Sequence, residues 1–190
     1  MMSGGATAMR GLANRGQSVT KKPDVLCVHQ NLGILKVPRN WDATISNENL
    51  RILSHVAFGR GEWDERVDDS RFPVPSSIVR PGQRFRVELF KSGDPFSPAS
   101  FDDSVKFLRD NGARFLGLQA AVLMIQQFGD KLKFDLDQEI VFVDERENLP
   151  VYGNTPHMLR IVVRDKKYDL GLKGIHDRVP NESVVGFFVV

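Results

Sequence analysis

Three carboxylates alternate along a predicted strand near residue 137, and their spacing suits metal binding. Asp135, Asp137 and Glu139 occupy every second position of the segment KFDLDQEIVFVDE. Alternate residues of a strand project from one face, and Mg²⁺ and Ca²⁺ prefer carboxylate oxygens as ligands. The three positions span about 13 Å, so a single cation would need ligands from another segment. A solvated strand face is the simpler interpretation, and Asp135 and Asp137 are kept as candidate ligands of a metal-dependent hydrolase.

A second group of charged residues surrounds a tryptophan in the segment GEWDERVDD. Trp63 is flanked by Glu62, Asp64 and Arg66 within residues 59–82, whose Gly, Pro, Ser and charged residues predict a long loop. Carboxylate pairs perform acid–base chemistry when burial raises one pKa, and nothing in the sequence indicates burial here. A tryptophan in such a loop either anchors the loop to the core or contacts a partner. We favour the anchor and keep these four residues as candidate partner-binding residues.

The thiol and imidazole groups show no catalytic spacing. Cys27 and His29 would share a strand face and could supply two soft metal ligands or a thiolate pair. No local motif adds the further ligand, orienting carboxylate or oxyanion donor that either chemistry needs. A buried cysteine beside a surface histidine is the simpler interpretation. The sequence therefore predicts no catalytic residue and no cofactor.

Basic residues dominate the N-terminus. Residues 1–22 contain no acidic residue and four cations, namely Arg10, Arg15, Lys21 and Lys22. The net charge of the chain is +2, so residues 23–190 carry 2 − 4 = −2. Small and polar residues fill the rest of this segment, which is typical of a disordered tail because little apolar surface is available for burial. The tail is either a nucleic-acid or targeting arm or a solvated terminus.

Further basic residues lie on predicted strands. They are Arg84, Arg86, Lys91, Arg160, Arg164, Lys166, Lys167 and Lys173. If their strands are neighbours, these side chains would form one strip that could bind a nucleic-acid backbone. In that alternative, Arg164, Lys166 and Lys167 of the predicted C-terminal hairpin act together with the basic tail.

Length and composition indicate one globular unit. A chain of 190 residues with 41% hydrophobic residues suits one domain with a sizeable core. The single cysteine excludes an intrachain disulfide and fits a reducing compartment. No apolar run approaches the ~20 residues of a membrane span, and the first residues lack the apolar core of a secretory signal. We therefore expect a soluble, cytoplasmic protein without a membrane partner.

Periodicity predicts both helices and strands. RFRVELF alternates, with Phe85, Val87 and Leu89 on one side. Ser100 predicts the start of a helix over FDDSVKFLRDNG, which ends at Asn111-Gly112. HMLRIVVRD and YDLGL predict a hairpin, and SVVGFFVV predicts a central strand because an exposed edge so apolar would invite aggregation. The apolar stretch 107–132 predicts helix, short strand and second helix, with its Met and Phe residues in the core rather than in a ligand site.

A resemblance agrees with this outline. The order of RFRVELF, a loop, SFDDSVKFLRDNGARFLGLQAAVLMIQQ, FVDERENL and a C-terminal apolar strand resembles a group of uncharacterised proteins of bacteria with reduced genomes. The resemblance covers residues 84–190 and includes the step Gly117-Leu118-Gln119. The tryptophans and paired cysteines near the C-terminus of that group are absent here. The resemblance implies one compact α+β unit and no particular activity.

These observations predict a single α+β domain over residues 23–190, with a mostly antiparallel or mixed sheet and two or three helices packed on one face. The preferred function is that of a non-enzymatic binding or accessory protein whose partner the sequence does not identify, with a protein as one candidate and a nucleic acid as a less supported one. Its working surface would be the loop 59–82 and the C-terminal hairpin. The alternatives are a nucleic-acid-associated protein and a metal-dependent hydrolase.

Overall fold

The structure is a computed structural model that describes residues 25–41, 76–94, 96–132, 139–164, 167–177 and 182–190. Within these ranges the chain forms a mixed eight-stranded sheet and two α-helices, which confirms the predicted α+β class. The predicted tail, residues 1–22, lies outside the described residues. Residues 59–75 of the predicted loop 59–82 also lie outside them.

The described elements follow one another in a fixed chain order. The strands are β1 (Leu26–Lys36), β2 (Arg84–Ser92), β3 (Ala113–Arg114), β4 (Glu139–Phe142), β5 (Val151–Tyr152), β6 (Thr155–Arg164), β7 (Lys167–Gly174) and β8 (Glu182–Val189). The helices are α2 (Phe101–Asp110) and α3 (Gly117–Phe128), with 3₁₀ turns η2 (Gly129–Lys131) and η3 (Arg146–Asn148). Neither α-helix of the described chain is long and apolar enough to cross a membrane.

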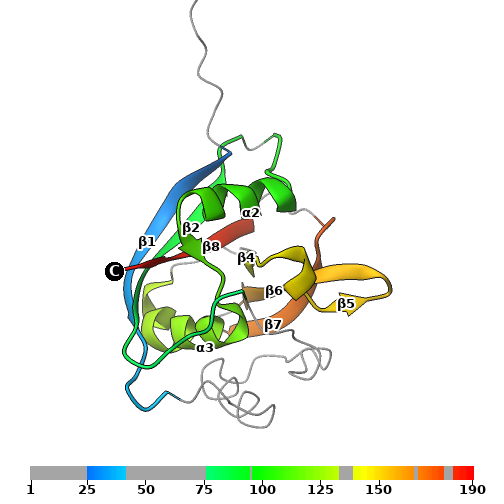
Figure 1. The fold of residues 1–190 in the computed structure, drawn as a ribbon. Coiled ribbons are helices and arrows are strands. Elements are labelled where there is room, and N and C mark those ends of the chain that lie inside the picture. The colour runs from blue at the N-terminus through cyan, green and yellow to red at the C-terminus, as the bar shows by residue number, and fades with distance from the viewer. Residues whose placement is uncertain (1–24, 42–75, 95, 133–138, 165–166, 178–181) are drawn as a thin grey trace, which may run out of the picture.

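The C-terminal strand lies in the middle of the sheet. The strand order is β1-β2-β8-β4-β6-β5, with β7 paired to β6 and β3 paired to β8. Figure 1 shows β8, in red, between β2 and the β4–β6 half of the sheet. β8 runs antiparallel to β2 and parallel to β4, whereas the other pairs are antiparallel. The predictions of a central last strand and of a β6–β7 hairpin are therefore confirmed.

The sheet is apolar on both faces. Along β8, Val185 and Phe187 belong to one hydrophobic cluster, whereas Val184 and Phe188 belong to a second one. Successive strand residues point to opposite faces, so an uninterrupted apolar run such as SVVGFFVV is buried on both sides. This is why the last strand carries no polar alternation.

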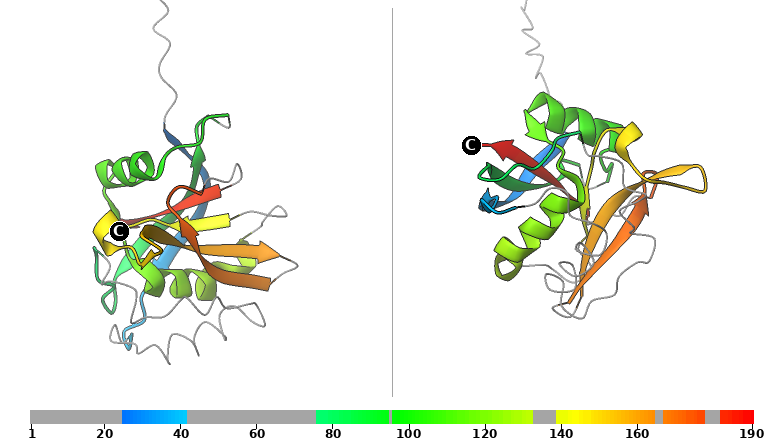
Figure 2. Two further views of the ribbon diagram at one scale, coloured as in Figure 1. Left: turned by 90° about the vertical axis from the view of Figure 1, so that its right-hand side faces the viewer. Right: turned by 60° about the horizontal axis from the view of Figure 1, so that its bottom comes forward.

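Each helix covers one of these two clusters. Val105 and Leu108 of α2 belong to the cluster of Val184, whereas the buried residues of α3 belong to the cluster of Val185. Figures 1 and 2 show α2 and α3 on either side of the strands. The helices pack on the sheet as expected of an α+β domain, and they are distributed over both faces because both faces are apolar.

The ends of α2 are set by local sequence. Ser100 is the N-cap, and its hydroxyl accepts a hydrogen bond from the backbone N–H of Asp103 at 3.1 Å. Phe101, Val105 and Leu108 are buried, and Asn111 is the C-cap, followed by Gly112 with φ of 79°. These are the residues that the sequence predicts for the start, the buried stripe and the end of this helix.

A glycine allows α2 to approach the sheet closely. A Cβ at Gly186 of β8 would lie 2.9 Å from ring atoms of Phe188 and Phe90 and 3.0 Å from Leu108 Cδ2. The close approach packs α2 on the hydrophobic cluster that contains Phe90, Leu108 and Phe188.

Candidate functional site

Most of the residues singled out from the sequence lie outside the described chain. This applies to the cluster Glu62, Trp63, Asp64 and Arg66, to the tail residues Arg10, Arg15, Lys21 and Lys22, to Lys166, and to Asp135 and Asp137. Arg164 and Lys167 form the last described backbone pair of the β6–β7 hairpin. The roles predicted for these residues stay predictions.

The basic strip is not formed among the described residues. Two of its expected members, Arg160 and Lys173, direct their charges at carboxylates. Arg84 and Arg86 lie on β2, which β8 and β4 separate from β6. Three strand spacings of about 4.8 Å put β2 and β6 roughly 14 Å apart. The hypothesis of one continuous strip is therefore wrong for the strands on which it was based.

The two cations belong to a partly buried cluster of four charges. Lys173 Nζ lies 3.2 Å from Glu139 Oε2 and also pairs with Glu182, and Arg160 Nη1 lies 2.9 Å from Glu139 Oε1. Only 3% of the Lys173 side chain and 10% of the Glu139 side chain are exposed. The prediction that Glu139 lies on a solvated strand face is wrong, because β4 is an interior strand and both of its faces are covered.

Strand register brings these charges together. Glu139 and Glu182 are paired residues at the starts of the parallel strands β4 and β8. Val141 pairs with Arg160, which places the guanidinium on the same face as Glu139 and one diagonal step away. Lys173 extends from β7, beyond β6, to reach both carboxylates. Two carboxylates and two cations balance within the cluster, as burial of charge requires.

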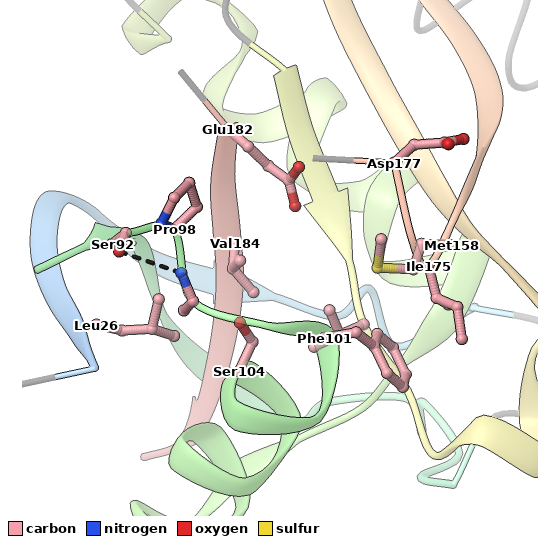
Figure 3. Close-up of a pocket in the computed structure, with 12 residues that line it drawn as sticks. Leu26, Ser92, Pro98, Phe101, Ser104, Met158, Ile175, Asp177, Glu182 and Val184 are labelled. Atoms are coloured by element: carbon pink, nitrogen blue, oxygen red, sulfur yellow. Dashed lines mark hydrogen bonds between the residues drawn. The ribbon is translucent and has the colours of Figure 1, made fainter. Parts of the chain in front are cut away.

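A small pocket opens beside this cluster at the end of α2. Its volume is about 40 Å³, and it is bounded by apolar side chains from several elements, namely Leu26, Phe101, Val143, Met158, Ile175 and Val184. Its polar lining residues are Ser92, Ser104, Asp177 and Glu182. Figure 3 shows the Glu182 carboxylate pointing toward the middle of the ring of lining residues, whereas the Asp177 carboxylate is turned outward. Glu182 is thus shared between the pocket and the charge cluster.

The loop that borders the pocket is held in a defined turn. Ser92 Oγ lies 3.0 Å from the carbonyl oxygen of Asp94 and accepts the backbone N–H of Ala99 at 3.2 Å. The Asp94 side chain accepts the backbone N–H of Phe96 at 2.9 Å. Such Asx turns stabilise a fixed loop shape. Pro98 and Ala99, which follow this turn, form part of the pocket wall.

This turn presents an aromatic side chain to solvent. Phe96 is 96% exposed, the largest value among the exposed large hydrophobic residues of the described chain. Two peptide units separate it from Pro98 of the pocket wall, so the two Cα atoms are at most about 7.6 Å apart. A phenyl ring in this position offers a large apolar contact area to a binding partner. Phe96 and the pocket together form one candidate docking surface.

A buried carboxylate stands at the other end of β4. Asp144 is 5% exposed and accepts hydrogen bonds from the hydroxyl and N–H of Ser76, from the N–H of Glu145 and from the Asn148 amide. Burial raises the pKa of the Asp144 carboxyl, and the hydrogen bonds from Ser76 and its other donors offset part of the rise. Because Ser76 begins the second described segment, Asp144 ties that segment to the turn η3.

No metal centre is formed by the described ranges, which contain no group of three or more His, Cys, Asp or Glu side chains able to hold an ion. Cys27 is exposed rather than buried as expected, because it lies on β1 at the edge of the sheet. His29 is also exposed, and β1 changes register between Val28 and Gln30. The geometry therefore does not build a thiolate–imidazole site.

Sequence reasoning missed Phe96. The segment SGDPFSPAS predicts only a turn between a strand and a helix, since Gly, Pro, Ser and Asp favour turns. The signal was the same one that drew attention to Trp63, namely an aromatic residue inside a turn-rich segment. Glu182 and Lys173 carried no such signal, because only the register of β4, β8 and β7 brings them together.

Together the fold and the site define only a broad structural class of protein. The chain is an α+β protein with a mixed sheet, an exposed phenylalanine on a hydrogen-bonded turn, and a small pocket into which one carboxylate points (Figure 3). A scan against protein-family models and searches of the curated proteins and of the solved structures found no match for this chain.

Proposed function

We propose that the protein is a non-enzymatic binding protein that docks a protein partner on Phe96 and the adjacent pocket. The observation that carries the proposal is the exposure of Phe96, at 96%, on a turn fixed by Ser92 and Asp94. Exposed aromatic residues held in a fixed position lose little conformational entropy on binding and are common interface hot spots.

The dimensions of the pocket support a protein partner over a free metabolite. Pockets for small-molecule ligands commonly measure about 300–1,000 Å³. The pocket here measures about 40 Å³, which is also smaller than the ~150 Å³ of a cavity that binds benzene. A volume of this size accepts one narrow side chain of a larger partner. The remainder of the contact would then fall on Phe96 and the loop around it.

An affinity capture of the full chain from its native cells tests the proposal. Wild type, Phe96→Ser and Val151→Ser are compared, each with and without nuclease treatment. Val151 is the matched control because it is an exposed apolar residue, 62% exposed, on the separate strand β5. We expect a partner that resists nuclease, that Val151→Ser retains, and that Phe96→Ser reduces by about thirtyfold, the effect of losing one hot spot of about 2 kcal/mol.

Two results would contradict the proposal. The first is the absence of any captured protein whose recovery depends on Phe96. The second is recovery that nuclease abolishes, which would indicate bridging by nucleic acid and support the alternative based on the basic tail. Steep salt dependence of the capture would point in the same direction.

A further inference from the structure

We infer that two copies of this chain associate through the first residues of β1, so that the sheet of one copy continues into the sheet of the other. The surface is the outer edge of residues 25–28, and its occupant is the same segment of a second copy in antiparallel orientation. Figure 1 shows β1, in blue, at the outer edge of the sheet, with β2 as its described neighbour. This self-association goes beyond the proposed function and does not depend on it.

The backbone of this segment has hydrogen-bonding groups that point away from the sheet. The N–H of Gly93 donates to the carbonyl oxygen of Val25 at 3.2 Å, so Val25 directs its carbonyl toward β2. Successive residues of an antiparallel strand direct their backbone groups to opposite sides, and the register has no shift from Leu26 to Val28. Cys27 therefore bonds to β2, whereas the N–H and C=O groups of Leu26 and Val28 face outward.

The other end of β1 is closed to a further strand. The backbone N–H of Lys36 donates to the side-chain oxygen of Gln127 at 2.9 Å, and the Lys36 carbonyl accepts the Gln127 side-chain amide at 2.7 Å. The Gln127 amide thus takes the place of a peptide unit of a neighbouring strand. Between the two ends, β1 changes register twice from Val28 to Gly33. Bulges twist an edge strand and interrupt regular pairing, so only residues 25–28 offer a regular open edge.

This open segment lacks the side chains that usually protect an edge. Residues 25–28 have the sequence VLCV, with no charged residue and no proline. Val28 is 55% exposed, Val25 is 39% exposed, and Cys27 is exposed as well. Proteins commonly place lysine or proline on an edge to prevent pairing with another chain. An exposed, uncharged segment with outward amide groups is instead a template for one more strand.

The segment is complementary to itself, which identifies the occupant as a second copy. Its two outward-facing residues are both used in one antiparallel register, with Leu26 of one copy opposite Val28 of the other. Four backbone hydrogen bonds then form around a two-fold axis that passes between the two Cys27 residues. The residues that meet are uncharged, so no like charges oppose each other across the axis. Such a contact closes at two copies, and its small size makes the dimer weak and dependent on concentration.

Sedimentation equilibrium of the full chain measures the self-association. We expect a reversible monomer–dimer equilibrium between about 10 μM and about 1 mM, the range of a small contact. Val28→Lys should raise the dissociation constant at least about tenfold, because it places a charge at the edge of each copy. Val151→Lys is the matched control, since it makes the same change at a valine that is 62% exposed on the separate strand β5. Its dissociation constant should equal that of wild type.

Amide hydrogen exchange of the wild type locates the contact without any substitution. The Leu26 and Val28 amides should exchange about tenfold more slowly in a concentrated sample than in a dilute one. The Cys27 amide bonds to β2 in either state, so its exchange should not change with concentration. This measurement also decides the question if Val28→Lys disturbs folding.

Disulfide formation tests the register, because Cys27 is the only cysteine of the chain. In the inferred register the two Cys27 residues form a non-hydrogen-bonded pair, with Cα atoms about 4.5 Å apart, which a disulfide can bridge. Added diamide accepts the two protons and two electrons of the thiols, becoming the hydrazine as the S–S bond forms. The covalent dimer should appear at least about tenfold faster than in Cys27→Ser/Val28→Cys, whose Cα atoms would be about 8–9 Å apart.

Five results would overturn the inference. Three are a monomer at every concentration, equal dissociation constants for Val28→Lys and Val151→Lys, and equal rates of disulfide formation at positions 27 and 28. A fourth is slow exchange of the Leu26 and Val28 amides at every concentration, which would assign the edge to another segment of the same chain. The fifth is loss of the captured partner in Val28→Lys without any self-association of the wild type, which would assign the edge to a strand of that partner.

Discussion

The charge cluster beside the pocket gives the sharpest stability prediction, through the substitution Lys173→Met. Methionine keeps most of the length of the apolar stem and removes the ammonium that Glu139 and Glu182 share. The Lys173 side chain is 3% exposed and that of Glu139 is 10% exposed, so water cannot replace the lost cation. Removal of one member of a buried ion pair costs about 3–5 kcal/mol. This is a large share of the ~5–15 kcal/mol that stabilises a typical domain.

Urea unfolding of the full chain near neutral pH measures this loss, with Lys106→Met as the control. Lys106 pairs with Asp110 four residues later on α2, and both side chains are mostly exposed, at 72% and 55%. Exposed pairs of this kind contribute only about 0.3–0.5 kcal/mol. The two lysine substitutions should therefore differ about tenfold in their effect on the free energy of unfolding.

A double substitution tests whether the lost stability comes from uncompensated charge. In Lys173→Met/Glu182→Gln the pair Arg160–Glu139 remains, and the cluster is again neutral. We expect the double variant to recover at least half of the stability lost by Lys173→Met, a coupling of about 1.5–3 kcal/mol. A loss below 1 kcal/mol for Lys173→Met, or strictly additive effects, would refute the reasoning that the cluster is buried and interdependent.

Three further substitutions probe the fold. Gly186→Ala should cost about 1–3 kcal/mol in urea unfolding, because the added methyl lies about 3 Å from Phe188, Phe90 and Leu108; an unchanged midpoint would contradict the close approach of α2. Ser100→Ala should cost about 1 kcal/mol and lower amide protection in the first turn of α2, whereas unaltered exchange there would exclude the cap. Asp144→Asn tests a pH effect. Burial holds the folded-state pKa of the Asp144 carboxyl above its ordinary 3.8. The contribution of this carboxyl to stability is therefore fully present below pH 3.8 and is lost as pH rises through the folded-state pKa. The free energy of unfolding of wild type minus that of Asp144→Asn should therefore increase on acidification from about pH 7 to about pH 4, and a constant or falling difference would show that the pKa is not raised.

Local patterns in the sequence were sufficient for several elements. The helix α2 was predicted from Ser100 to Asn111 because capping and first-turn charge are decided by residues within one turn of each other. The sequence likewise predicted β2 and the β6–β7 hairpin, since strand periodicity and short turns are local properties. For β2 the evidence was the alternation of Phe85, Val87 and Leu89. The assignment of the apolar stretch of α3 to the core also holds.

The candidate site could not be predicted in the same way. The local pattern assigned Glu139 to a solvated acidic face, because its partners Lys173 and Arg160 lie 34 and 21 residues away in the chain. The basic strip failed for the same reason, since strand order rather than strand composition determines which side chains meet. The turn-rich segment around Phe96 offered a local signal. The exposure of Phe96 depends on whether another part of the described chain packs over the turn, and no local pattern records that.

The sequence by itself determined the α+β class, the helix termini, the strand periodicity and the central place of the last strand, because these depend on neighbouring residues and on the balance of apolar and polar side chains. Only the tertiary structure decided that β4 and β8 run side by side in parallel, that both faces of the sheet are covered, and that a pocket forms where α2, β8 and the end of β7 meet. Those features depend on pairing between segments that are distant in the chain, and the free energy of such pairing is set by the whole packed arrangement rather than by any one segment.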